Sequence, residues 1–111
     1  MAVANDKLRR IGQHGVVTLP TEIDVTNTDE IRQALLSASH DVAVLIIDMS
    51  GTTFCDSAGV HAIIAAYREA AAAGTELRLV ATAVLRILTL TGVDQLIPIY
   101  PTLEAALAAR T

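Results

Sequence analysis

Hydrophobic residues alternate along the chain between continuous runs typical of strands and spaced patterns typical of helices. Val42–Met49 is an almost unbroken apolar run of strand length, which predicts a central strand covered on both faces. Other β-branched or apolar runs predict strands at Val16–Ile23, Leu77–Val80 and Leu96–Tyr100. Because proline cannot donate to a sheet, Pro20 confines the first of these to an edge or ends it, and Pro98 places the last at an edge.

Between these runs, apolar residues recur at helical spacing. The first predicted helix begins after Asn27, which together with Glu30 has the pattern of a capping box. The second predicted helix begins near Ser57 and ends before Gly74. The inner faces are predicted to be Ile31, Ala34, Leu35 and Ala38 in the first helix, and Val60, Ile63, Ile64, Tyr67 and Ala71 in the second.

Two shorter helices complete the predicted elements. One covers Ala83–Leu90 and ends at Gly92, and the other begins at Pro101-Thr102 with Leu103 and Leu107 on its inner side. Strands that alternate with helices predict an α/β fold with a mainly parallel sheet and helical cover. Because the chain has 111 residues and no internal repeat, we expect a single domain over residues 1–111.

The composition favours a folded domain, since 52% of the residues are hydrophobic and 18% are charged. Eight basic and twelve acidic residues give a net charge of −4, which argues against nucleic acid and anionic membranes as partners. The chain has two tyrosines, one phenylalanine and no tryptophan, so base stacking is also disfavoured. The composition therefore directs attention to protein partners.

The expected compartment is the cytoplasm. No apolar run reaches the roughly 18 residues of a membrane span, and charged residues interrupt the first twelve residues, unlike a signal peptide. Cys55 is the single cysteine, which excludes an internal disulfide and a cysteine zinc site. We predict a small buried role for Cys55 at the end of the central strand, and we expect neither a metal nor another cofactor.

Two polar loops follow predicted strands and mark the candidate site. In open α/β sheets, functional residues gather where strand carboxyl ends lead into helix N-termini. The loops are Glu22–Asn27, after the first long strand, and Phe54–Gly59, after the central one. If those strands are neighbours, Asp24 and Ser57 lie close together.

Two interpretations of Ser57 stay open from the residues alone. Ser57 has the position of an N-cap, a role that Asp56 also fits. Alternatively, the loop is built for contact, because Gly59 stands in the first helical turn, where glycine is unfavourable without a close approach. A phosphate on Ser57 would be accommodated by the positive end of the helix and would repel a docked partner. The outer helix face would be His61, Ala65, Arg68 and Ala72.

The segment Phe54-Cys55-Asp56-Ser57-Ala58-Gly59-Val60, preceded by Val44–Gly51, resembles the signature of STAS domains, the anti-sigma factor antagonist family. The resemblance extends through Glu22-Ile23-Asp24, Gly74–Val80 and Leu90–Leu96, and covers roughly residues 16–108. It implies a mixed, mainly parallel sheet with helices packed on one side. It also implies partner switching: the chain binds an anti-sigma factor with serine kinase activity and is released by phosphorylation, which a serine phosphatase reverses.

In this resemblance, Ser57 matches the phosphorylated serine and Asp24 matches an acidic residue that contributes to kinase recognition. ATP would belong to the partner. The expected partner-binding residues are Asp24, Thr26, Asn27, Asp56, Ala58, Gly59 and His61. Two residues depart from the family pattern: Ala58 replaces a serine or threonine, and His61 replaces a small or apolar residue, although a solvated histidine also fits that position.

Two alternative functions remain. A hydrolase would use Ser57 as nucleophile with His14, His40 or His61 as base, but these histidines lie on other elements or farther along the same helix, so we expect no enzyme. A STAS module without a phosphorylation cycle could act as a scaffold or as a subunit of a membrane transport complex. The joint presence of Asp24 and Ser57 favours the phosphorylation switch.

Overall fold

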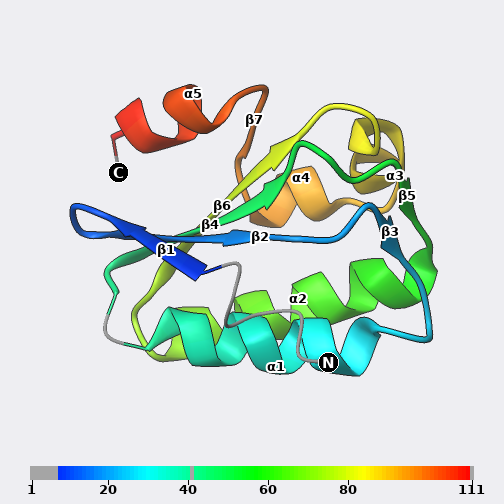
Figure 1. The fold of residues 1–111 in the computed structure, drawn as a ribbon, viewed down its shortest axis with the longest axis horizontal. Helices are drawn as coiled ribbons and strands as arrows, with labels where there is room; N and C mark the ends of the chain where they lie inside the picture. Colours follow the sequence, from blue (N-terminus) through cyan, green and yellow to red (C-terminus); the bar gives the residue numbers. More distant parts are fainter. Residues whose placement is uncertain (1–7, 41, 111) are drawn as a thin grey trace.

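The computed structural model describes residues 8–40 and 42–110. Within them, five strands form the main sheet in the order β1-β2-β4-β6-β7 (Figure 1). Their bounds are Leu8–Ile11 for β1, His14–Thr18 for β2, Val44–Met49 for β4, Glu76–Ala81 for β6 and Ile99–Tyr100 for β7. Strands β2, β4, β6 and β7 run parallel, and β1 is antiparallel to β2. The predicted mixed, mainly parallel sheet is therefore confirmed.

Helices cover both faces of this sheet. Figure 1 shows α1 (Thr28–Ser39) and α2 (Ser57–Ala72) side by side on one face, and α5 (Leu103–Ala108) on the opposite face. The short helices α3 (Leu85–Leu90) and α4 (Val93–Leu96) contribute to the same core as α1 and α2. The two long helices pack on one side as expected, and the short α5 adds cover to the other. No helix in the described part of the chain combines the length and apolar character needed to cross a membrane.

The alternation of side chains along β4 divides the interior into two cores. Leu45, Ile47 and Met49 belong to the larger core under α1 and α2. Val44 and Ile46 belong to a smaller core that includes Ala106 of α5. All six residues of β4 are buried, which confirms that this strand is central and explains its continuous apolar run.

The predicted strand Val16–Ile23 is divided in two. Strand β2 ends at Thr18, and Glu22–Ile23 forms β3, which pairs in parallel with β5 (Phe54–Cys55) in a separate two-stranded sheet. Pro20 lies in the break, where its missing amide costs no ladder hydrogen bond. The sequence interpretation also missed β1, whose four residues are all exposed and which joins β2 through Gly12 at a φ of 61°.

Helix ends and faces differ from expectation in three places. The capping box is wrong, because the Asn27 side chain makes no capping hydrogen bond to α1. Ala71 of α2 is exposed, and the additional buried positions are Gly59 and three alanines: Ala62, Ala66 and Ala70. Small side chains there suit the contact of α2 with α1 and the sheet. Gly74 follows α2 with a φ of 87°, as predicted for a residue that ends a helix.

The carboxyl-terminal elements keep their predicted order with altered bounds. Leu96 belongs to α4, which was not predicted, so β7 is reduced to Ile99–Tyr100 at the sheet edge, directly after Pro98. Thr102 caps α5 by accepting a hydrogen bond from the Ala105 amide at 3.1 Å. Leu103 and Leu107 are half-buried against the smaller core, as predicted. The expectation about the chain's first residues falls partly on 1–7, which lie outside the described residues.

Candidate functional site

Pairing of β3 with β5 brings the two predicted loops together. Ile23 is opposite Cys55 in this parallel pair, and the Asp56 amide donates to the Ile23 carbonyl at 3.2 Å. Asp24 directly follows β3 and Asp56 directly follows β5, so the two aspartates come straight after paired residues. Ser57 is the next residue after Asp56. The expected proximity of the Asp24 and Ser57 loops is produced by these two-residue strands, and not only by the long strands that precede them.

Hydrogen bonds from the buried Thr52 and the exposed Thr53 hold this pair in place. The Thr52 side chain is fully buried and donates through Oγ1 to the Pro20 carbonyl at 2.8 Å. The Thr53 amide donates to the Thr21 carbonyl, also at 2.8 Å. These bonds link the loop after β4 to the loop after β2, so the start of α2 is anchored at a fixed place on the sheet.

Asp56, and not Ser57, caps α2. Asp56 has extended backbone dihedrals, and its Oδ1 accepts from the Gly59 amide at 3.1 Å. Ser57 is the first residue of the helix and is exposed. Among the residues that the structure describes, nothing forms a hydrogen bond with its hydroxyl. The N-cap interpretation of Ser57 is thus wrong, and its hydroxyl is free to contact another molecule.

The two capping candidates can be separated by their effects on stability. Asp56→Ala is expected to lower the free energy of unfolding by about 1 kcal/mol, because the Gly59 amide loses its acceptor. Ser57→Ala is expected to change it by less than about 0.5 kcal/mol, as for an exposed side chain without partners. Urea denaturation measures both values, with Asp56→Asn as a variant that keeps an acceptor. A larger loss for Ser57→Ala than for Asp56→Ala would contradict the assignment.

Asp24 is held by its own loop. Its Oδ1 accepts hydrogen bonds from the Thr26 hydroxyl and, at 2.9 Å, from the Thr26 amide. These two bonds lower the pKa of the Asp24 carboxyl below its ordinary value. Asn27 completes the loop by accepting from the Asp24 amide at 3.1 Å and donating to the Glu22 carbonyl at 2.8 Å. Thr26 and Asn27 therefore position a charged carboxylate beside the start of α2.

Gly59 is required by the fold itself. The residue is buried, and a Cβ at this position would lie 2.6 Å from Ile23 Cγ2 and 2.7 Å from Cys55 Sγ. Those distances are too short for a real Cβ, so the close approach that its glycine predicted is internal. This corrects the interpretation of Gly59 as a mark of partner contact, because α2 packs on the β3–β5 pair at this residue.

Cys55 is buried, as predicted, but ends β5 and not the central strand. Burial, together with the negative charge of Asp56, raises the pKa of the Cys55 thiol to about 11. The reactive thiolate is therefore scarce at neutral pH, which disfavours a redox role for this residue.

The outer face of α2 is accessible next to Ser57. His61 and Arg68 are exposed, while Ala58 and Ala65 are half-buried. A shallow groove runs between α1 and α2 beside this face, lined in part by Thr28, Arg32, Ala58, His61 and Ala65. His61 is solvated, in agreement with the simpler interpretation of this residue. Arg32 reaches across the α1–α2 contact to Glu69 at 3.5 Å.

Sequence reasoning missed the exposed apolar residues that flank these loops. Val25 is 74% exposed beside Asp24, Phe54 is 49% exposed before Ser57, and Leu90 of α3 is 73% exposed. Phe54 and Leu90 line a second groove together with Val84 and Ile87. The pattern in the sequence could not reveal this groove, because the same residues fit the inner sides of a strand and a helix. The rarity of aromatic residues was the one available indication for Phe54.

The histidines proposed as alternative bases lie apart from one another. His40 follows the C-terminal end of α1. The α1 residues near the start of α2 lie at the other end of α1. His14 contacts Arg78 on the face covered by α5. Within residues 8–40 and 42–110, no three His, Cys, Asp or Glu side chains gather in a way that could hold a metal ion.

Comparison with known proteins gives consistent matches. Residues 6–106 match the family model of the STAS domain. The fold is similar to the crystal structure of an anti-sigma factor antagonist from Mycobacterium paratuberculosis, with a TM-score of 0.82 and 31% identity over 90% of this chain and 87% of that one. None of the curated proteins compared with the chain matches it significantly.

Two more distant structures show the same fold. The Bacillus cell fate determinant SpoIIAA, in its phosphorylated form, has a TM-score of 0.67 and 22% identity over 90% of this chain and 94% of that one. A sulfate transporter family protein from Wolinella succinogenes has a TM-score of 0.77 and 18% identity over 96% of this chain and 91% of that one. At these identities, the likeness extends to the fold alone.

Proposed function

The chain belongs to the STAS domain family, and we propose that it acts as an anti-sigma factor antagonist whose binding is switched by phosphorylation of Ser57. The observation that carries this proposal is the Ser57 hydroxyl, which is exposed and is not used to cap α2. A kinase needs such a free hydroxyl as its acceptor. The 16-residue helix that begins there is long enough to favour a negative charge at its N-terminus.

The surroundings of Ser57 explain how a phosphate would act. A phosphoserine carries about −1.5 to −2 charge at neutral pH, and the helix amides accommodate it without rebuilding the fold. Asp24 and Asp56 already place negative charge on the neighbouring loop positions. A partner seated on this surface would have to desolvate the added charge, so the unphosphorylated chain binds and the phosphorylated chain is released.

The proposed partner is an anti-sigma factor with serine kinase activity, and a cognate serine phosphatase would restore binding. Catalysis and ATP binding then reside in these partners, in the cytoplasm. Support comes from the likeness to an anti-sigma factor antagonist and to a Bacillus protein whose structure is that of a phosphorylated form. The expected contact residues include Asp24, which follows the strand paired with β5, and Ala58 and His61, which follow Ser57 in α2.

A STAS subunit of a transport complex is the second candidate function. It is favoured by the likeness to a sulfate transporter family protein, which extends over 96% of this chain. In that case Ser57 would be an ordinary exposed serine.

Affinity capture with tagged Ser57→Ala as bait, followed by mass spectrometry, distinguishes the two candidates. The variant keeps the Asp56 cap and cannot be phosphorylated at residue 57. We expect it to recover a protein with a serine kinase fold. Recovery of membrane transport subunits without such a kinase would refute the antagonist proposal and support the second candidate.

A further inference from the structure

Arg78 is a buried arginine on the sheet face opposite α1 and α2. It is 2% exposed, and its register partners are Ile46 on β4 and, one strand farther, Val16 on β2. A guanidinium group remains charged in proteins, so its burial requires hydrogen-bond acceptors and a compensating charge. The partners of the guanidinium group therefore show which elements Arg78 holds together.

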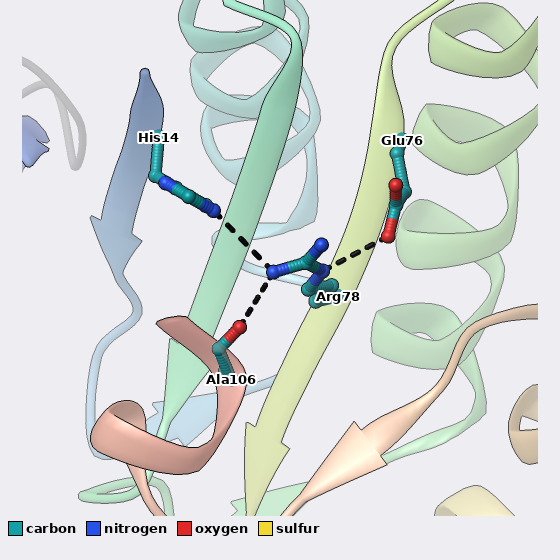
Figure 2. A network of polar contacts seen from close by, with 4 residues as sticks. All are labelled: His14, Glu76, Arg78 and Ala106. Carbon is teal, nitrogen blue, oxygen red and sulfur yellow. Dashed lines mark hydrogen bonds and ion pairs between the residues drawn. The ribbon is translucent and has the colours of Figure 1, made fainter. Parts of the chain in front are cut away.

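Three groups contact the guanidinium, as Figure 2 shows. Its Nε donates to Glu76 Oε2 at 2.9 Å, and its NH1 donates to the Ala106 carbonyl of α5 at 2.6 Å. NH1 also lies 3.4 Å from Nε2 of the half-buried His14. A neutral imidazole with its proton on Nδ1 can accept a hydrogen bond at Nε2. A protonated imidazole would instead place a second positive charge against Arg78.

Helix α5 depends on this contact. It has six residues, too few for a helix to be stable in water by itself. The Ala106 carbonyl belongs to the last turn, where carbonyls have no partner within the helix, and Arg78 satisfies it. The remaining attachment is apolar, through fully buried Ala106 and half-buried Leu103 and Leu107.

We propose that His14 and Arg78 form an acid-sensitive latch that holds α5 on the sheet. Neutral His14 accepts from Arg78 and leaves NH1 directed at Ala106. Protonation of His14 repels the guanidinium and weakens its bond to the Ala106 carbonyl. Helix α5 then detaches and uncovers the smaller core, while α1, α2 and the Ser57 loop keep their positions on the other face.

The other charged groups around His14 determine the direction of the effect. Arg9 of β1 is opposite Val16 in the antiparallel pair and so lies on the same face, which adds positive charge. Glu76 is the carboxylate that contacts Arg78, and Asp48, farther along β4, accepts from the Ser50 amide at 3.0 Å. Glu104 and Arg110, on and after α5, are exposed. Because Glu76 is already paired with Arg78, the latch weakens as pH falls.

Amide hydrogen exchange at about pH 7.5 and about pH 5.5 tests the latch, because histidine ordinarily titrates near 6.5. After correction for intrinsic exchange rates, we expect the protection factors of the α5 amides, such as that of Ala106, to be about tenfold or more lower at the lower pH. Amides of α2 serve as the internal reference. In His14→Gln, which stays neutral, the loss should disappear, whereas the matched control His61→Gln should behave as the wild type.

Equal protection of α5 at both pH values in the wild type would overturn the proposal, as would an undiminished loss in His14→Gln. If His14→Gln does not fold, an NMR titration of the wild type decides instead. The chemical shifts of the α5 amides should follow the titration of the His14 ring. A midpoint that follows His40 or His61 and not His14 would also refute the latch.

Discussion

Ser57→Asp is expected to weaken binding to the kinase-type anti-sigma factor that we propose as partner by at least about thirtyfold, which corresponds to ~2 kcal/mol. The aspartate adds a negative charge at the exposed start of α2, beside Asp24 and Asp56. We expect that a docked partner would have to remove water from this charge without a compensating group opposite it. Ser57→Ala should bind within about threefold of the unphosphorylated wild type, because the hydroxyl has no partner in the described structure.

Isothermal titration calorimetry measures this difference, and Ser37→Asp provides the matched control. Ser37 is an exposed serine on α1, distant in the helix from the residues that face Ser57. The same change in net charge at that position should alter affinity by less than about threefold, since exposed charges beyond a Debye length of about 8 Å are screened. Equal weakening by both variants would show a general charge effect and contradict a local switch.

Gly59→Ala is expected to be the most damaging small substitution near the site. Its Cβ would stand 2.6 Å from Ile23 Cγ2 and 2.7 Å from Cys55 Sγ, and both neighbours are buried. Overpacking of a filled core costs about 1–3 kcal/mol, and two contacts below 3.0 Å with buried side chains place this substitution in the upper part of that range, at about 2–3 kcal/mol. The higher helix propensity of alanine recovers about 1 kcal/mol. We therefore expect a net loss of about 1–2 kcal/mol in the free energy of unfolding, measured by urea denaturation.

Gly51→Ala is the matched control, because a Cβ there meets no atom within 4 Å. It should change stability by less than about 0.5 kcal/mol. A second variant locates the clash: Cys55→Ala removes Sγ, so the double variant should lose less stability than the sum of its two single variants. Strict additivity, or a harmless Gly59→Ala, would contradict the packing of α2 on the β3–β5 pair.

Elements whose place in the fold follows from a local sequence pattern could be predicted. The continuous apolar run of β4 identifies a buried central strand, and the position of Pro98 places β7 at the edge, because both follow from local backbone chemistry. The pairing of β3 with β5 was not predictable. It depends on contacts between distant residues, such as Thr52 with the Pro20 carbonyl, which leave no periodic pattern.

The candidate site, too, could be predicted only in part from the sequence. Its location near Ser57 and Asp24 follows from the sequence, but the roles of neighbouring residues do not. Aspartate and serine both cap helices, and only the backbone geometry assigns the cap to Asp56. The sequence marks Gly59 as unusual in a helix. The reason for the glycine is the close approach of Ile23, on a strand that the sequence does not place beside it. The latch residues His14 and Arg78 were not predicted to meet, because they lie on strands separated by β4.

The central claim is that the exposed Ser57 hydroxyl accepts a phosphate. Its most direct measurement is mass spectrometry of the purified chain after incubation with ATP and the kinase-type anti-sigma factor that we propose as partner. We predict one added phosphate group, located at Ser57 by fragmentation and absent from Ser57→Ala. Phosphate on another residue, or its persistence in Ser57→Ala, would contradict the account.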